Sequence, residues 1–426
     1  MRNKKGWIFL FSLLLCAACV GYSFWQYEQS ETQMPVIILD PYEDQKYNTL
    51  KELRPTTITV TYPNQMGTLE LQAQVRLRGN STLYFSKKSY KIELEEKLDL
   101  RVGVDIEESS DREWVLLANS FDHSNLRNYY AFWVAARLGN FGFVPEGIFV
   151  ELYVTNDDGE NEYCGVYLLC EQIEVQETRV DVDVTTETEK GFLIEMVEYP
   201  QEIYTIEVAH EGELIEYDVR SQVEGQEDLD RIEAVLQSVE DALATGEQSE
   251  IEAVLDMDSC VDMYILQEYI MNRDVGWASF YYYCEAGESV LYMGPPWDFD
   301  RSMGSSSTLY GGSYEGLSAG NAEVTDTYAH PWFQTLMQME WFQELVKERW
   351  NETKDIYAAG LVEIQGLSED YATQMQDNFD VWYTEKVGVD QMVVYGENYA
   401  EDAEYLFNWL ENRYLWFDNY WNGADG

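Results

Sequence analysis

The chain has 426 residues, of which 46% are hydrophobic and 15% aromatic, so it can bury a large core and is not an acidic disordered chain. Its formal net charge is −52, from 79 acidic and 27 basic residues. So negative a surface excludes nucleic acid and anionic lipid headgroups as expected partners, because both would be repelled.

The first residues predict the compartment. Residues 1–25 combine a basic start with an apolar run from Trp7 to Trp25, which is typical of a signal peptide or an uncleaved signal anchor. A lipoprotein cleavage site before Cys19 is the third interpretation, and a polar linker follows over residues 26–34. We therefore expect an extracytoplasmic protein, membrane-anchored or secreted, that contacts the membrane through its N-terminus if the anchor is retained.

The next segments have the β-branched, partly alternating pattern of antiparallel strands, at residues 35–40, 57–62, 69–79 and 87–94. Five cations lie within sixteen residues of this region: Arg76, Arg78, Lys87, Lys88 and Lys91. In so acidic a chain this concentration predicts a local anion-binding site. The alternative is an exposed edge strand protected by lysines.

A helix is predicted from Leu126 to Leu138, with Asp122 or Ser124 as its N-cap. A hairpin follows, turning at residues 156–159 and closing at Glu171. Further along, the pattern predicts a strand at 191–197, an inserted hairpin within 200–226, and helices at 228–245 and 260–271, the second capped by Asp258.

Four cysteines follow the N-terminal segment, at Cys164, Cys170, Cys260 and Cys284, and none forms a CxxC pair. With only three histidines in the chain, a structural zinc site is poorly supported. The spacing of Cys164 and Cys170 predicts one face of one strand. Buried free thiols are the default, and a disulfide between Cys260 and Cys284 is the alternative.

The most informative stretch runs from Asn272 to Gly304. Two aromatic-rich runs, 280–284 and 290–293, predict a hairpin, with Asp274 and Ser279 before it and Asp298 and Asp300 after it. A hairpin returns its far end close to its start, so Asp274 and Asp298 are expected to face one small volume. Carboxylates and a hydroxyl are the oxygen ligands that Mg²⁺ takes. The alternative is that these are ordinary acidic turn residues.

Residues 305–320 form a loop rich in Ser, Gly and Tyr, and three helices dense in aromatic residues are predicted at 331–350, 361–383 and 398–421. The loop is interpreted either as a segment that positions substrate or as a surface loop without a role.

Several motifs together resemble the CotH family, the spore coat protein H-like kinases, which are distant relatives of the protein kinase fold. They are RLRGNS (76–81), KKSYKIEL (87–94), GVYLLCEQIE (165–174), NRD (272–274) and PPWDFDRSMG (295–304). The resemblance extends over residues 36–416. It implies an α+β, two-lobed kinase-like fold, with a β-rich N-terminal lobe over 35–199, a mostly helical C-terminal lobe over 200–421 and a tail at 422–426.

The resemblance also implies ATP and Mg²⁺ as cofactors and Ser or Thr of a protein as acceptor, the acidic surface favouring a basic or Ser-rich partner. In this interpretation Asp274 orients or deprotonates the acceptor hydroxyl, and Asp298 holds Mg²⁺ with Ser279 and Asp300. Ser279 stands where most kinases have Asn, a departure that weighs against a second metal ion. The expected nucleotide-binding residues are Arg76, Arg78, Asn80, Lys88, Lys91, Arg127 and Glu171, with Lys91 pairing with phosphate and Glu171 orienting a lysine.

Two other classes stay open. A glycosidase would share the acidic, aromatic-rich composition and paired carboxylates, but it leaves the basic segment around Arg76 and Lys91 unexplained. The other is a non-catalytic surface scaffold or adhesin of the same fold, which the scarcity of ATP outside the cytoplasm favours.

Overall fold

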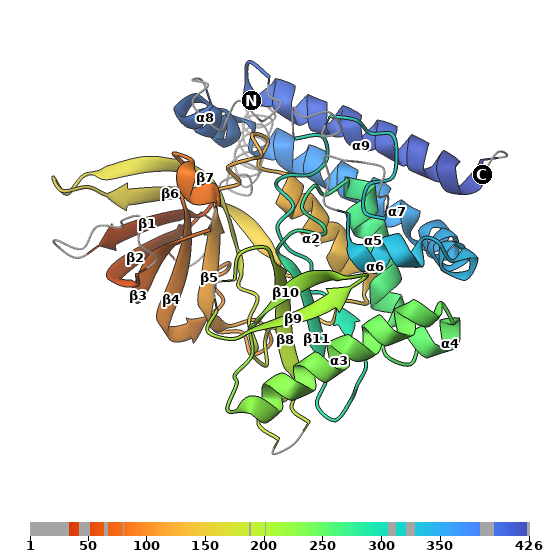
Figure 1. Cartoon of the computed structure of the whole chain (residues 1–426). Helices are drawn as coiled ribbons and strands as arrows, with labels where there is room; N and C mark the ends of the chain where they lie inside the picture. The colour runs from red at the N-terminus through yellow and green to blue at the C-terminus, as the bar shows by residue number, and fades with distance from the viewer. Residues whose placement is uncertain are drawn as a thin grey trace, which may run out of the picture.

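The fold combines a closed barrel, a five-stranded sheet and a group of helices (Figure 1). The computed structural model describes residues 34–41, 52–63, 67–79, 81–186, 189–200, 202–305, 312–320, 329–383 and 396–423. In Figure 1 the barrel lies on the left, the sheet at the lower centre, and most of the helices at the top and right.

The N-terminal strands close into the barrel, in the order β1-β2-β3-β4-β5-β7-β6. Their bounds are β1 (Val36–Pro41), β2 (Arg54–Tyr62), β3 (Gly67–Arg78), β4 (Ser89–Leu98), β5 (Asp111–Leu117), β6 (Gly147–Thr155) and β7 (Asn161–Glu171), with a short 3-10 helix η1 (Ser81–Tyr84) between β3 and β4. Closure comes from β6, which pairs parallel with β1. Alternate side chains, such as Ile58 and Val60 or Tyr90 and Ile92, fill the interior.

The predicted strands are therefore confirmed, whereas the edge-strand interpretation of the basic segment is wrong. β4 lies between β3 and β5 inside a closed barrel, so it has no free edge for lysines to protect. The mixed α+β class is confirmed as well. Closure of the N-terminal strands into a barrel is a feature that the sequence pattern did not predict.

Strand β7 contains an irregularity that separates two of the cysteines. Its register with β6 shifts between Leu152 and Tyr153, opposite Cys164 and Gly165. An extra residue in one strand reverses the faces of all residues beyond it. Cys164 therefore packs against the barrel interior while Cys170 belongs to the core outside it, and the prediction of a shared face is wrong. All four cysteines of the described region are free, so Cys260 and Cys284 do not form a disulfide.

The second sheet has the order β12-β11-β8-β10-β9. It consists of β8 (Phe192–Val197), β9 (Thr205–His210), β10 (Glu213–Val219), β11 (Phe280–Cys284) and β12 (Tyr292–Met293), and confirms both predicted hairpins. Its strands come from both sides of the predicted boundary at residue 199. Side chains on one of its faces, including Ile206, Val208 and Tyr217, share a core with Ile232 and Val235 of α3 (Gln226–Thr245).

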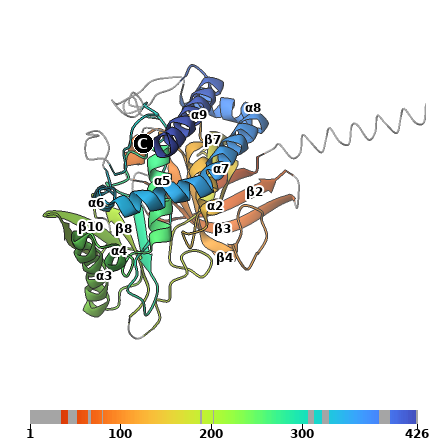
Figure 2. The same cartoon turned by 90° about the vertical axis from the view of Figure 1, so that its right-hand side faces the viewer.

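The remaining helices are α2 (Arg127–Leu138), α4 (Gln248–Ile251), α5 (Met257–Ile270), α6 (Pro331–Leu336), α7 (Glu340–Asp370), α8 (Ala372–Trp382) and α9 (Tyr399–Asn422). Seen from the helical side, α7 crosses in front of α2 and α5 (Figure 2). The N-cap of α5 is Asp256, which accepts a hydrogen bond from the Ser259 N–H (2.8 Å), and not the predicted Asp258.

Helix α7 is 31 residues long and spans a predicted break between two helices. Gly360 lies inside it, where a Cβ would come within 2.9 Å of the Tyr130 ring and 3.0 Å of Val134 on α2. A glycine normally weakens a helix interior, but here it allows two helices to pack closely. The predicted break is therefore wrong, because packing outweighs local propensity.

Within the described residues, no helix combines the length and apolar character needed to cross a bilayer. The predicted N-terminal segment, residues 1–25, lies outside the described residues, as do most of the linker at 26–34 and all of the tail beyond Gly423.

Candidate active site

The hairpin of β11 and β12 brings Ser279 and Asp298 together. The Ser279 hydroxyl donates a hydrogen bond to Asp298 Oδ2 at 3.1 Å. Both residues have a left-handed backbone, with φ of 60° and 66°, which costs an ordinary L-residue about 1–2 kcal/mol. Such strain is retained only where the surroundings over-determine it, often at functional sites. The two turns are therefore held in a specific geometry.

Asp274 lies beside this pair. Arg301 Nη1 donates to both of its carboxylate oxygens, at 2.8 and 3.1 Å, and the same guanidinium lies over the Phe121 ring at 5.1 Å. Burial raises the pKa of Asp274, Arg301 opposes this, and the negative charge of Asp298 adds to the rise. The charge of Asp298 therefore acts on Asp274, as the predicted proximity requires, and Arg301 holds Asp274 in a fixed orientation.

Asp298 and Asp300 differ in exposure. The Asp298 side chain is open to solvent yet closely surrounded by protein, and that partial dehydration raises its pKa. Asp300 is buried, and the pKa of its carboxyl is raised well above its usual range by burial and then by the charges of Asp298 and Asp122. No hydrogen bond or ion pair joins the Asp300 carboxylate to any other described residue.

The charge of Asp298 raises the pKa of both Asp274 and Asp300, so a hard divalent cation placed among these carboxylates would stabilise their charged forms. Asp298, Asp300 and the Ser279 hydroxyl therefore fit Mg²⁺, which is commonly bound through one or two carboxylates and keeps waters or phosphate oxygens in its shell. Across the described ranges, no group of three His, Cys, Asp or Glu side chains is already arranged around one metal position.

Among the predicted cations, Arg78 is the one that joins this group. Its guanidinium lies over the Trp297 ring at 5.1 Å, and its charge lowers the pKa of Asp298. The residues described by the structure give this guanidinium no hydrogen bond or ion pair. A cation that is stacked on an aromatic ring and lacks an anionic partner is available to a ligand anion.

The other predicted cations have partners within the protein. Arg76 Nη1 donates to the Leu77 carbonyl at 3.4 Å. Lys91, directly opposite Arg76 in the β3–β4 register, forms an ion pair with Glu113 of β5. The Lys88 ammonium donates to the carbonyl oxygens of Leu83 and Phe85. Asn80 lies outside the described residues.

Glu171, predicted to orient a lysine, binds two arginines instead. Its Oε1 lies 3.3 Å from Arg101 and 3.2 Å from Arg179, and its Oε2 accepts a hydrogen bond from the Glu146 N–H at 2.8 Å. Burial raises the pKa of Glu171, and the two arginines oppose the rise. Glu113 is the acid that pairs with the β4 lysine.

Arg127 is buried and stabilises the turn that follows Asp298. Its Nε donates to the Ser302 carbonyl at 3.0 Å, its Nη2 to the Met303 carbonyl at 3.2 Å, and its Nη1 pairs with Asp122. Asp122 also accepts a hydrogen bond from the Arg127 N–H (2.8 Å), so it satisfies the first turn of α2 although Leu126 occupies the N-cap position. Arg127 thus positions the turn and does not face a ligand.

Replacing Arg127 by alanine is expected to lower the free energy of unfolding by about 3–5 kcal/mol, because the buried Asp122 loses its ion-pair partner. Urea denaturation measures the change, with Arg112→Ala as the control because Arg112 is exposed. A loss no larger than that of the control would show that Arg127 does not hold the turn.

Lys87 is buried, unlike the other four predicted cations. Its ammonium donates to the Val166 carbonyl at 2.6 Å and lies over the Tyr167 ring at 4.7 Å. Burial lowers its pKa from 10.5 to about 7, although the charges of Asp122 and Cys164 oppose this. Sequence reasoning did not single it out, since burial cannot be read from a run of lysines.

This pKa predicts a pH dependence of stability. Between about pH 7 and pH 9 the unfolded chain keeps the Lys87 proton while the folded chain releases it, so stability rises with pH. One proton changes the free energy of unfolding by ~1.4 kcal/mol per pH unit. We therefore expect the rise in the free energy of unfolding between about pH 7 and pH 9 to be about 2 kcal/mol smaller in Lys87→Met than in the wild type. Urea denaturation at both pH values compares this variant with Lys97→Met, a control on an exposed lysine. Equal slopes in wild type and Lys87→Met would contradict the assignment.

Arg301 and Trp297 are the residues of the candidate site that sequence reasoning missed. Both stand within the PPWDFDRSMG motif, next to Asp298 and Asp300. The motif was the available signal, but the partners of the two side chains, Asp274 and Arg78, come from distant segments.

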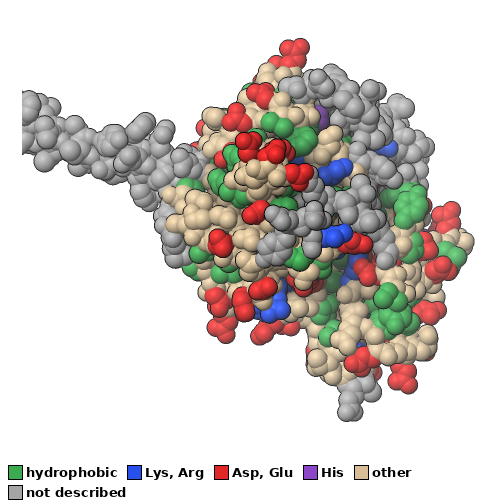
Figure 3. Space-filling view, turned by 90° about the vertical axis from the view of Figure 1, so that its left-hand side faces the viewer, with side chains coloured by type: hydrophobic (Ala, Val, Ile, Leu, Met, Phe, Trp, Pro, Cys, Tyr) green, Lys and Arg blue, Asp and Glu red, His purple; other side chains and the backbone are tan. Residues whose placement is uncertain are grey.

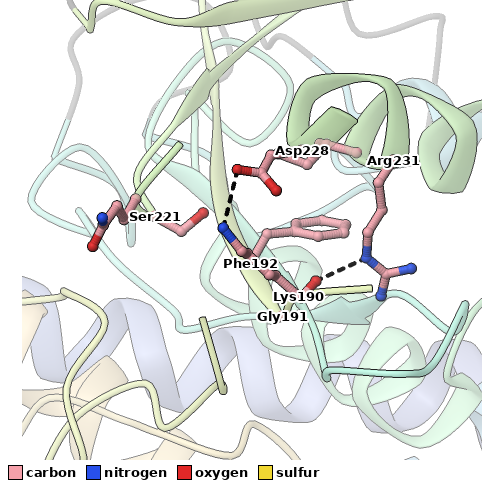
Figure 4. Close-up of a pocket in the computed structure, with 8 residues that line it drawn as sticks. Lys190, Gly191, Phe192, Ser221, Asp228 and Arg231 are labelled. Carbon is pink, nitrogen blue, oxygen red and sulfur yellow. Dashed lines mark hydrogen bonds and ion pairs between the residues drawn. The ribbon is translucent and has the colours of Figure 1, made fainter. Parts of the chain in front are cut away.

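A small depression elsewhere on the surface includes none of these residues. It is lined by Lys190, Gly191, Phe192, Ser221, Gln222, Asp228, Arg231 and Ile232 (Figure 4). Arg231 donates to the Glu288 carbonyl (2.7 Å) in the β11–β12 turn, at the opposite end of the hairpin from Ser279. Lys190 pairs with Glu224 and Asp228 (2.8 and 3.4 Å), so these charges serve the structure.

A known family matches the part of the chain that contains these residues. The family model described as CotH kinase protein matches residues 75–417, from within β3 to near the end of α9. Since this is most of the chain, the protein belongs to the CotH kinase family. No curated protein matches the chain.

Proposed function

We propose that the chain is an extracytoplasmic protein kinase that uses ATP and Mg²⁺ to phosphorylate a serine or threonine of a partner protein. The observation that supports this most directly is the grouping of a clamped aspartate, Asp274, with a solvent-open aspartate, Asp298, and with Arg78, to which the described residues give no ion pair. Membership in the CotH kinase family supports the same reaction class.

In this proposal Asp298, Ser279 and Asp300 hold the metal, and Arg78 binds phosphate oxygens. When bound, Mg²⁺ offsets the negative charge of the phosphates. The chain as a whole repels ATP, because its net charge is −52. A free cation at the site is therefore needed more here than in a neutral protein. Arg76, Lys88 and Lys91 contribute to the local potential while remaining paired within the protein.

Asp274 orients the acceptor hydroxyl and accepts its proton as the bond between the acceptor oxygen and the γ-phosphorus of ATP forms. The bond from that phosphorus to the ADP oxygen breaks in the same transfer, and ADP leaves. Arg301 holds the carboxylate in place and opposes the rise in its pKa, so that Asp274 stays ionised before the transfer. Phosphoryl transfer depends mainly on positioning and charge stabilisation, so these residues suffice without a catalytic His or Cys.

The fold fits this reaction if the barrel acts as the nucleotide-covering N-terminal lobe and the helices act as the C-terminal lobe. The grouped residues lie where β3 of the barrel meets the β11–β12 hairpin of the second sheet. The partner is a basic or Ser-rich protein, as the acidic surface favours. The N-terminal segment directs the chain out of the cytoplasm and contacts the membrane if it is retained.

Isothermal titration calorimetry of the full chain with ATP tests the proposal, with and without Mg²⁺. Binding that requires Mg²⁺, followed by transfer of labelled phosphate to a basic protein substrate, is the expected result. A folded protein that binds no nucleotide at any concentration would instead be the surface scaffold or adhesin.

A further inference from the structure

The loop that joins β8 to β9 presents an unusual amount of apolar surface. Among the described residues, Ile203 and Tyr199 are the most exposed large apolar side chains, at 90% and 70%, and Tyr204 beside them is 41% exposed. Single exposed apolar residues are normal, whereas several gathered in one short loop are typical of an interaction site.

This loop is fixed beside the candidate active site. The Tyr199 ring contacts the Trp277 ring, with a centroid distance of 6.4 Å, and the Trp277 N–H donates to the Asp274 carbonyl at 3.0 Å. Near its other end, Glu202 pairs with Arg220, whose Nε donates to Glu195 at 2.7 Å. The exposed side chains are therefore positioned relative to Asp274 and do not belong to a remote surface.

The neighbouring strands add negative charge. Glu207 of β9 lies directly opposite Glu216 of β10, and Glu216 pairs in turn with Val197 of β8. Because Phe280 pairs with Met196, Ser279 stands at the level of Val197, in the same cross-strand row as the two glutamates. Like charges directly opposite each other on a sheet are destabilising, and a cation from a partner would relieve the repulsion.

Acidic side chains are spread over the face of the molecule that Figure 3 shows, and Lys and Arg are visible at only a few places. An anionic partner segment would be repelled from this surface, whereas a cationic one would be attracted.

We propose that the loop and the glutamate pair form a docking surface for the acceptor protein, made of Tyr199, Ile203, Tyr204, Glu207 and Glu216. Its occupant is an extended cationic segment with one bulky apolar side chain that packs on Ile203 and Tyr199. The inference rests on the proposed kinase activity, and it adds a specificity determinant: an apolar residue at a set distance from the acceptor hydroxyl.

Synthetic peptides test the proposal by direct binding to the full chain, measured by fluorescence anisotropy without ATP. Each peptide contains one serine, flanking arginines and a single phenylalanine at a varied distance from the serine, and its control has alanine in place of phenylalanine. At the best distance, we expect the phenylalanine peptide to bind about tenfold more tightly, as burial of one apolar side chain predicts.

Ile203→Ser is expected to abolish this preference, while Leu415→Ser preserves it because Leu415 is a comparably exposed residue (67%) on α9. Replacing Glu207 and Glu216 together by glutamine is expected to weaken the binding of both peptides about equally. It is also expected to make that binding less dependent on salt concentration. None of these side chains is buried, so the variants are expected to fold.

Equal binding of the two peptides at every distance would overturn the proposal. So would a change from dimer to monomer in Ile203→Ser, because the surface would then bind a second copy of the chain. A preference for phenylalanine that depends on Ile203, in a protein that transfers no phosphate, would support the docking surface and count against the kinase activity.

Discussion

Asp298→Ala is expected to abolish Mg²⁺-dependent ATP binding. Asp298 is the solvent-open carboxylate of the group, hydrogen-bonded to Ser279 and close to the charge of Arg78. Without it, Asp300 is the remaining buried carboxylate of the proposed metal site, and a single carboxylate binds Mg²⁺ weakly. Calorimetry on the wild-type and variant chains measures the loss directly.

Asp241→Ala is the matched control, because Asp241 is an exposed aspartate on α3, outside the candidate site. The control is expected to bind Mg²⁺ and ATP like the wild type. If Asp298→Ala bound the nucleotide as well as this control does, the metal site would have to lie elsewhere.

Asp274→Asn is expected to lower the rate of phosphate transfer and to leave nucleotide binding unchanged. Removing a general base that accepts a proton from the acceptor typically lowers the rate by about 10²–10⁴-fold. The amide keeps the size of the side chain and can still accept one hydrogen bond from Arg301, so the turn should keep its structure. Phosphate transfer to a peptide measures kcat, and calorimetry on the same preparation measures ATP binding.

Asp258→Asn controls for the loss of one negative charge, since Asp258 is an exposed aspartate in the first turn of α5. A kcat in Asp274→Asn equal to that of the control would exclude Asp274 as the base. Together with unchanged nucleotide binding in Asp298→Ala, that result would favour the non-catalytic scaffold.

Local patterns in the sequence predicted most of the individual elements. Alternation identified the strands that became β1 to β4, and turn residues identified both hairpins of the second sheet. The motif spacing around the β11–β12 hairpin also placed Asp274 near Asp298, because a hairpin is a local structure whose two ends must meet. The helix ends at Gly139 and Gly246 followed from glycine in the left-handed conformation.

The errors arose where packing between distant segments outweighed a local rule. Gly360 lies inside α7 because it makes room for α2, and Cys164 and Cys170 diverge because of one irregular position in β7. Closure of the barrel depends on a parallel pairing of β1 with β6, which no local pattern encodes.

By itself, the sequence determined the α+β class, the acidic surface, the motifs of the CotH kinase family and the chemical types of the candidate residues. The tertiary structure decided which cation acts on Asp298, which arginine clamps Asp274, and which acids pair with Lys91 and Arg127. The reason is physical: residue type and spacing report the backbone's local conformation. The partner of a charge depends on burial and on contacts between segments far apart in the chain.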